Sequence, residues 1–157
     1  GVPEGEAFLV SGSQRRKLEG GGGGGEGLPE DPRRWVREAP FRLRDGVRSF
    51  PAPESRFVGE ILLRKRTAEA GTDVLFQAGG RGWRIPLGAH LPSGDGWVRL
   101  RLERGQDSVR FLAGGREVLS VPPEALGSLL HPAPDAPAFG IRAWGGDVEV
   151  REVRWRK

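Results

Sequence analysis

Apolar and polar residues alternate in short runs along most of this chain, and Gly, Asp and Pro separate the runs. The clearest alternation covers 97–103, where Val98, Leu100 and Leu102 share one face and charged residues occupy the other. A period of two residues is typical of a β-strand with one buried face. This pattern predicts strands at 6–10, 41–44, 47–50, 56–66, 72–78, 83–87, 97–103, 108–113, 116–121, 138–144 and 148–155.

Three places carry a more specific prediction. An Asp45-Gly46 pair between the runs 41–44 and 47–50 predicts a compact hairpin. In the last run, Val148 and Val150 differ in parity from Val153 and Trp155, which predicts a bulge near Arg151-Glu152. The prolines that open 122–130 are typical of the first turn of a helix, so we expect a short helix there.

The many short, half-polar strands and the near absence of helical periodicity favour an all-β fold, a two-layer antiparallel β-sandwich. We expect one domain over 1–157 with a flexible glycine-rich loop at about 20–32, because Gly20–Gly25 are consecutive glycines. A phosphate-binding loop would need Lys and Ser or Thr after the glycines. The sequence has neither there.

Composition excludes several function classes. The 157 residues include no Cys, so disulfides, thiolate chemistry and Cys-ligated metals are ruled out. The 25 Lys and Arg against 21 Asp and Glu are spread evenly, which does not favour nucleic-acid binding. No apolar run is long enough to span a membrane. Because the chain opens at Gly1 rather than Met, we expect a processed product or a piece of a longer protein.

Three segments carry a family likeness: 96–104 with Trp97, 108–118 with its Gly114-Gly115 turn, and 139–153. They resemble the concanavalin A-like, laminin-G-type jelly roll, and more narrowly the 3-keto-disaccharide hydrolase family. The resemblance implies a jelly-roll sandwich and, for the narrower family, hydrolysis of a modified glycoside. Ala70–Asp73 stands where the hydrolase-like members carry Asn-Ser-Gly, which favours a role without catalysis.

Catalytic and metal-binding residues are hard to find. His90 and His131 lie in proline-rich connections without ligand spacing, and no Gly-x-Ser-x-Gly motif occurs, so no catalytic residue is assigned. Each of the strand glutamates lies beside Arg, which indicates cross-strand ion pairs rather than an acid–base pair: Glu60, Glu103, Glu117 and Glu149. No cofactor or metal ligand is assigned. Calcium binding stays open, with turn acids as the candidates: Asp73, Asp95, Asp107 and Asp147.

The tryptophans give the only ligand-site hypothesis. Trp83 and Trp144 adjoin glycine-rich turns, where a sugar could approach an exposed ring, and Arg84 and Arg142 would supply hydrogen-bond donors beside them. The leading interpretation is a non-catalytic recognition or assembly module of an exported or envelope-attached bacterial protein. Its partner would be carbohydrate or a protein surface, and its location extracytoplasmic or secreted. Two alternatives stay open: a glycoside-processing enzyme of the 3-keto-disaccharide hydrolase type, and a self-assembling structural subunit.

Overall fold

The computed structural model describes residues 34–92 and 96–157. Trp35–Lys157 form one compact unit. The strand expected at 6–10 and the glycine-rich loop expected at about 20–32 lie outside the described residues.

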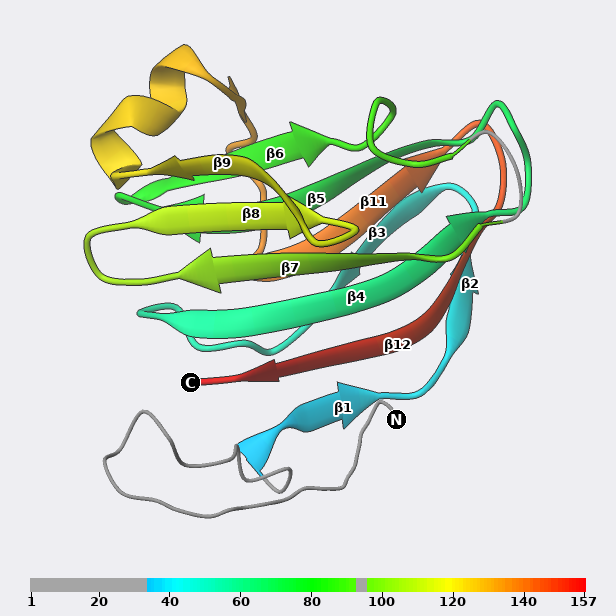
Figure 1. Cartoon of the computed structure of the whole chain (residues 1–157), viewed down its shortest axis with the longest axis horizontal. Coiled ribbons are helices and arrows are strands. Elements are labelled where there is room, and N and C mark those ends of the chain that lie inside the picture. Colours follow the sequence, from blue (N-terminus) through cyan, green and yellow to red (C-terminus); the bar gives the residue numbers. More distant parts are fainter. Residues whose placement is uncertain (1–33, 93–95) are drawn as a thin grey trace. The chain divides into compact units, whose positions relative to one another are not determined.

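Two antiparallel sheets build the unit, and Figure 1 shows them as two layers. The seven-stranded sheet has the following strands in order, with β2 (Phe41–Leu43) also paired to β12: β1 (Val36–Glu38), β12 (Val148–Arg156), β4 (Phe57–Lys65), β7 (Val98–Arg104), β8 (Val109–Ala113) and β9 (Arg116–Val121). The five-stranded sheet has this order: β10 (His131–Pro132), β6 (Arg81–Pro86), β5 (Gly71–Ala78), β11 (Phe139–Trp144) and β3 (Gly46–Ser49). The predicted all-β sandwich is therefore confirmed.

Alternation along each strand sends one set of side chains between the sheets. From the seven-stranded sheet come Ile61, Leu63 and Leu102, each buried. From the five-stranded sheet come Phe76 and Ile141, which are also buried. Removing this much apolar surface from water is the main stabilising contribution to such a fold. The polar residues between these positions lie on the two outer faces.

The hairpin predicted at 41–50 is wrong. β2 pairs with β12 and β3 pairs with β11, so these two strands belong to different sheets. The chain crosses between the sheets at Asp45-Gly46, where Gly46 has φ +132°. There the Asp45 carboxylate accepts a hydrogen bond from the Gly145 N–H at 3.1 Å. A short strand pairs with whichever long neighbour offers a free edge, and local alternation carries no information about that neighbour.

The predicted bulge and helix are both present. The register of β12 against β4 shifts between Val150 and Glu152, and this returns Val153 and Trp155 to the core. The helix η3 (Pro123–Ser128) is a single 3₁₀ segment, shorter than the expected 122–130, and it buries Leu126. Among the described residues, no helix is long and apolar enough to cross a membrane.

Candidate functional site

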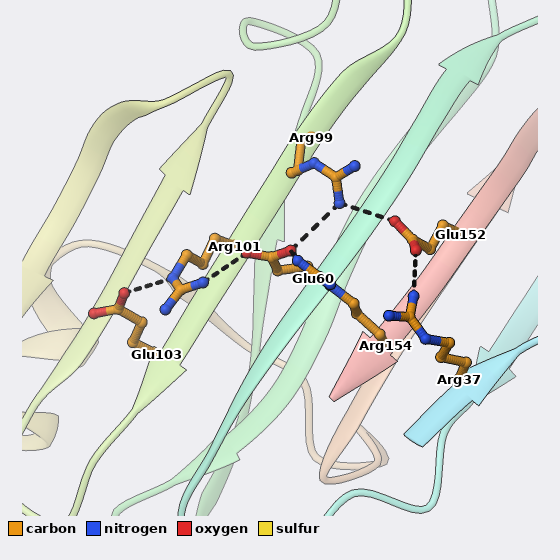
Figure 2. A network of polar contacts seen from close by, with 7 residues as sticks. All are labelled: Arg37, Glu60, Arg99, Arg101, Glu103, Glu152 and Arg154. Carbon is orange, nitrogen blue, oxygen red and sulfur yellow. Dashed lines mark hydrogen bonds and ion pairs between the residues drawn. The ribbon is translucent and has the colours of Figure 1, made fainter. Parts of the chain in front are cut away.

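The outer face of the seven-stranded sheet is a lattice of Arg and Glu side chains (Figure 2). Glu60, on β4, is at its centre and is only 5% exposed. Its Oε2 accepts from Arg101 at 2.6 Å and its Oε1 accepts from Arg154 at 2.7 Å. Arg99 adds a longer contact of 3.3 Å and also bridges to Glu152 at 3.0 Å.

Charge pairing sets the ionisation of these carboxyl groups. Burial by itself would raise the pKa of Glu60, but the hydrogen bonds and charges of Arg154 and Arg101 outweigh it and hold the pKa below its ordinary value. The hydrogen bond from Arg101 likewise lowers the pKa of Glu103. Both groups are therefore ionised at neutral pH and act as structural ion-pair partners. The predicted cross-strand pairs are confirmed for all four glutamates: Glu60, Glu103, Glu117 and Glu149.

The outer face of the five-stranded sheet is different, because the register of its strands brings charged, aromatic and apolar side chains together on it. One row across the strands holds His131, Arg84, Leu75, Gly140 and Ser49. The next row holds Pro86, Asp73, Arg142 and Val47. The last row pairs Gly71 with Trp144. Three of the four predicted ligand residues, Arg84, Arg142 and Trp144, thus share one face, called the Trp144 face below.

Trp144 places an exposed tryptophan side chain on this face. Its indole ring lies across Gly71, where a Cβ atom would collide with the ring, so glycine is needed at that position. The guanidinium of Arg142 lies over the ring, with Cζ 4.8 Å from the centroid. Stacking of this kind leaves the in-plane N–H groups free to donate. Trp144 as a whole is 40% exposed, so part of the residue remains accessible to a ligand beside the guanidinium.

Asp73 is a buried carboxyl group in the sheet next to Arg84 and Arg142. Its side chain is fully buried, with Oδ2 3.5 Å from Nη1 of Arg84. Its Oδ1 has no hydrogen-bond partner among the residues that the structure describes. Burial raises the pKa of Asp73, and the positive charges of Arg84 and Arg142 offset only part of that effect. This carboxyl therefore contacts the Arg84 side chain and is too buried to contact a ligand directly.

Trp83 does not share the Trp144 face, and the expectation that its ring is exposed is wrong. It is 3% exposed and packs in the core, where its Nε1–H donates to the carbonyl of Ala78 at 3.0 Å. The ring reaches the wall of a cleft of about 430 Å³ beside η3 but presents almost no surface to it. Its position next to a glycine-rich turn did not indicate its orientation, because alternation along β6 decides that.

Asp73, Gly71 and His131 also lie on this face, although no sequence pattern assigned them to the ligand site. Asp73 carried a usable signal, since it is a charged residue at the start of the apolar run Val74–Phe76. Gly71 and His131 carried none, because their roles depend on pairing with β11 and β6.

No metal site emerges from the described residues. Within 34–92 and 96–157, no group of three or more His, Asp or Glu side chains converges as a metal site would require. Of the calcium candidates, Asp73 is buried under Arg84, and Asp107 and Asp147 lie in turns of separate connections. Asp95 lies outside the described residues.

Comparison with known proteins bears on the fold. No protein-family model matches the chain, and neither does any curated protein. Among solved structures, a β-fructofuranosidase from Aspergillus kawachii matches at TM-score 0.53 and 12% identity, over 78% of this chain and 27% of that one. A fructosyltransferase from A. japonicus matches at TM-score 0.53 and 13% identity, over 78% and 26%. A glycosyl-hydrolase-like protein from Parabacteroides distasonis matches at TM-score 0.50 and 10% identity, over 82% and 92%.

The two-layer β-sandwich fold that these structures share with the chain is consistent with the expected concanavalin A-like jelly roll. The expected architecture is thus confirmed. At these identities the likeness concerns the fold alone, and this chain spans only about a quarter of the length of the two fungal enzymes.

Proposed function

We propose that this chain is a non-catalytic recognition module whose Trp144 face binds carbohydrate. The observation that carries the proposal is the Trp144 indole, exposed and seated across Gly71, with the Arg142 guanidinium stacked on it. An aromatic surface beside planar N–H donors suits a sugar ring, which presents C–H groups on one side and hydroxyls at its edge.

The charged groups of the Trp144 face limit the class of saccharide that it suits. Arg84 and Arg142 place two guanidinium groups on this face, whereas the carboxyl group of Asp73 is buried beneath Arg84. Neutral or acidic saccharides therefore suit the face better than basic ones. Several proteins of this fold are named for acting on carbohydrates, which makes sugars the first ligand class to test.

The residues of the Trp144 face support binding over hydrolysis. Glycoside hydrolysis commonly needs two carboxyl groups about 5–9.5 Å apart across the scissile bond. Among the residues of β3, β5, β6, β10 and β11, the structure describes one carboxyl group on this face, Asp73, and it is buried. An exported or envelope-attached location fits a module that binds extracellular glycans, and it belongs to the same proposal.

Titration against a glycan array, followed by calorimetry on the best ligand, tests the proposal. We expect Trp144→Ala and Arg142→Ala each to weaken binding at least about tenfold, which corresponds to about 1.4 kcal/mol. Arg142→Lys should also weaken it, because ammonium lacks the planar fork. Arg116→Ala, an exposed arginine on β9 of the other sheet, is the matched control and should bind like the parent.

Three results would contradict this proposal. Binding that survives Trp144→Ala would move the site elsewhere. Turnover of a bound glycoside by the purified chain would favour the glycoside-processing alternative. Association without any glycan, measured by light scattering, would favour the self-assembling alternative, in which the exposed edges of strands such as β3 and β9 would be the contacts.

A further inference from the structure

A second cleft lies at the other end of the five-stranded sheet, away from the Trp144 face. Gly71, under the indole, begins β5, while Ala78, which ends that strand, lines this cleft. Eight residues of extended chain separate the two places, roughly 20–25 Å. The cleft has a volume of about 610 Å³, within the range of small-molecule sites.

Arg104 is the residue that gives this cleft its chemistry. It ends β7, in register with Phe57 and Val109, whose side chains are both buried in the core. Residues paired in register share a face, so Arg104 extends toward the space between the sheets rather than to the outer lattice of arginines and glutamates. An arginine at the open end of a sandwich thus reaches inward, into the cleft.

The guanidinium of Arg104 is incompletely paired. Its Nε and Nη1 are buried, and neither has a hydrogen-bond partner within residues 34–92 and 96–157. Burial lowers the pKa of Arg104, and the charge of Glu54 offsets this only in part. Buried charged donors in folded proteins nearly always have acceptors, and their absence here indicates that an acceptor comes from outside the described residues.

The other walls of the cleft narrow the identity of that acceptor. Arg81 supplies a second guanidinium and Glu54 a carboxylate, so the cleft carries one net positive charge. One carboxylate neutralises it, whereas a doubly charged phosphate would leave an excess next to Glu54. Gln77, whose amide donates to Ala136 O at 2.8 Å, adds a fixed polar group to the wall.

We propose that this cleft binds the carboxylate of a compact, hydroxyl-bearing organic acid such as a uronic acid, with Arg104 as the principal contact. This site is separate from the Trp144 face and does not depend on the function proposed for it. Glu54 and Gln77 lie where they can accept hydrogen bonds from hydroxyls of the same ligand. A peptide C-terminus presents the same carboxylate chemistry, and the choice of probes separates the two sources.

Sodium glucuronate, titrated by calorimetry at constant ionic strength, is the first probe, and glucuronamide is its neutral match. We expect saturable binding of glucuronate and at least tenfold weaker binding of the amide. A short peptide with a free C-terminus is the second probe. Tighter binding of that peptide than of glucuronate would retain the carboxylate site and assign it to a protein partner.

Two variants separate a binding role of Arg104 from a structural one. Arg104→Met removes a charged group with unpaired buried donors and keeps an unbranched apolar side chain in place of the aliphatic part of arginine. We expect it to abolish glucuronate binding while the melting temperature stays the same or rises. Glu54→Gln removes the competing carboxylate, and we expect it to strengthen glucuronate binding several-fold. Arg116→Ala, on β9 of the other sheet, should leave glucuronate binding unchanged.

The opposite results would overturn the proposal. If Arg104→Met unfolds the chain and Glu54→Gln does not strengthen glucuronate binding, Arg104 has a structural role only. If Glu54→Gln does strengthen glucuronate binding, the site is retained. Equal responses to glucuronate, glucuronamide and inorganic sulfate would show that the cleft holds only water and adventitious ions. Binding of glucuronate that disappears in Trp144→Ala but persists in Arg104→Met would assign the acid to the other face.

Discussion

Replacement of Glu60 by Gln provides the sharpest test of the ion-pair lattice on the seven-stranded sheet. The substitution preserves the size of the side chain and removes its charge. The two closest partners, at 2.6 Å from Arg101 and 2.7 Å from Arg154, would then lose the carboxylate that neutralises them. Because Glu60 is almost fully buried, water cannot replace it at that position.

The size of the effect follows from burial. Removing one partner of a fully buried ion pair costs about 3–5 kcal/mol. The arginines here keep between 25% and 43% of their side-chain surface exposed, so water hydrates part of the charge that is left. We therefore expect Glu60→Gln to lower the free energy of unfolding by about 2–3 kcal/mol at neutral pH. For a unit of this size, that is roughly 6–12 °C in melting temperature.

The pH dependence gives an independent check. The pKa of Glu60 is lowered in the folded state from the ordinary value of 4.5. Its contribution to stability is therefore complete above that ordinary value and disappears as the pH falls through the lowered folded pKa. Urea unfolding across a pH series should show parent and Glu60→Gln differing fully at pH 7 and converging in acid.

Glu117→Gln is the matched control. This glutamate also pairs with an arginine, Arg110, at 2.8 Å, but its side chain is 49% exposed. Exposed pairs contribute little, so we expect a change within about 0.5 kcal/mol. A loss of stability in Glu60→Gln no larger than in Glu117→Gln would contradict this expectation, and so would a difference from the parent that persists unchanged in acid.

Three further predictions concern other parts of the fold. Gly71→Ala should displace the Trp144 ring and weaken glycan binding about as much as Trp144→Ala, with a small change in melting temperature. Unchanged glycan binding in calorimetry would show that the position of the ring against Gly71 does not matter for binding. Deletion of Arg151 should prevent a cooperative urea transition, because without the bulge either Val150 or Val153 turns to the outer face. Asp73→Asn should be at least as stable as the parent at neutral pH. The pKa of Asp73 is raised in the folded state, so ionisation of this carboxyl lowers the folding stability of the parent as the pH rises through that folded pKa. A urea midpoint of Asp73→Asn below that of the parent would contradict this prediction.

Alternation predicted most of the strands because each one carries a complete pattern within itself. The pattern at 97–103 and the parity change around Arg151 both depend only on neighbouring residues, and both were confirmed. The pairing of strands depends on distant segments. That is why Asp45-Gly46 was interpreted as a hairpin turn, although the strands on either side of it belong to different sheets.

The same contrast explains the site. Trp144 alternates with Ile141 and Ala143 and so faces outward, whereas Trp83 shares its parity with Ile85 and faces the core. Parity along the strand would have distinguished the two tryptophans, while proximity to glycines did not. The contribution of Asp73 follows from the register of three strands and from the arginines that cover it, which no local pattern contains.

The pairing of β12 also has a consequence for the order in which the fold forms. β12 is the last strand of the sandwich along the chain, and it pairs with β1, β2 and β4. Because β1 and β2 both pair with β12, neither can join the seven-stranded sheet before β12 is in place. The sheet is therefore completed by pairing between segments more than 100 residues apart, and slow folding is characteristic of such long-range pairing.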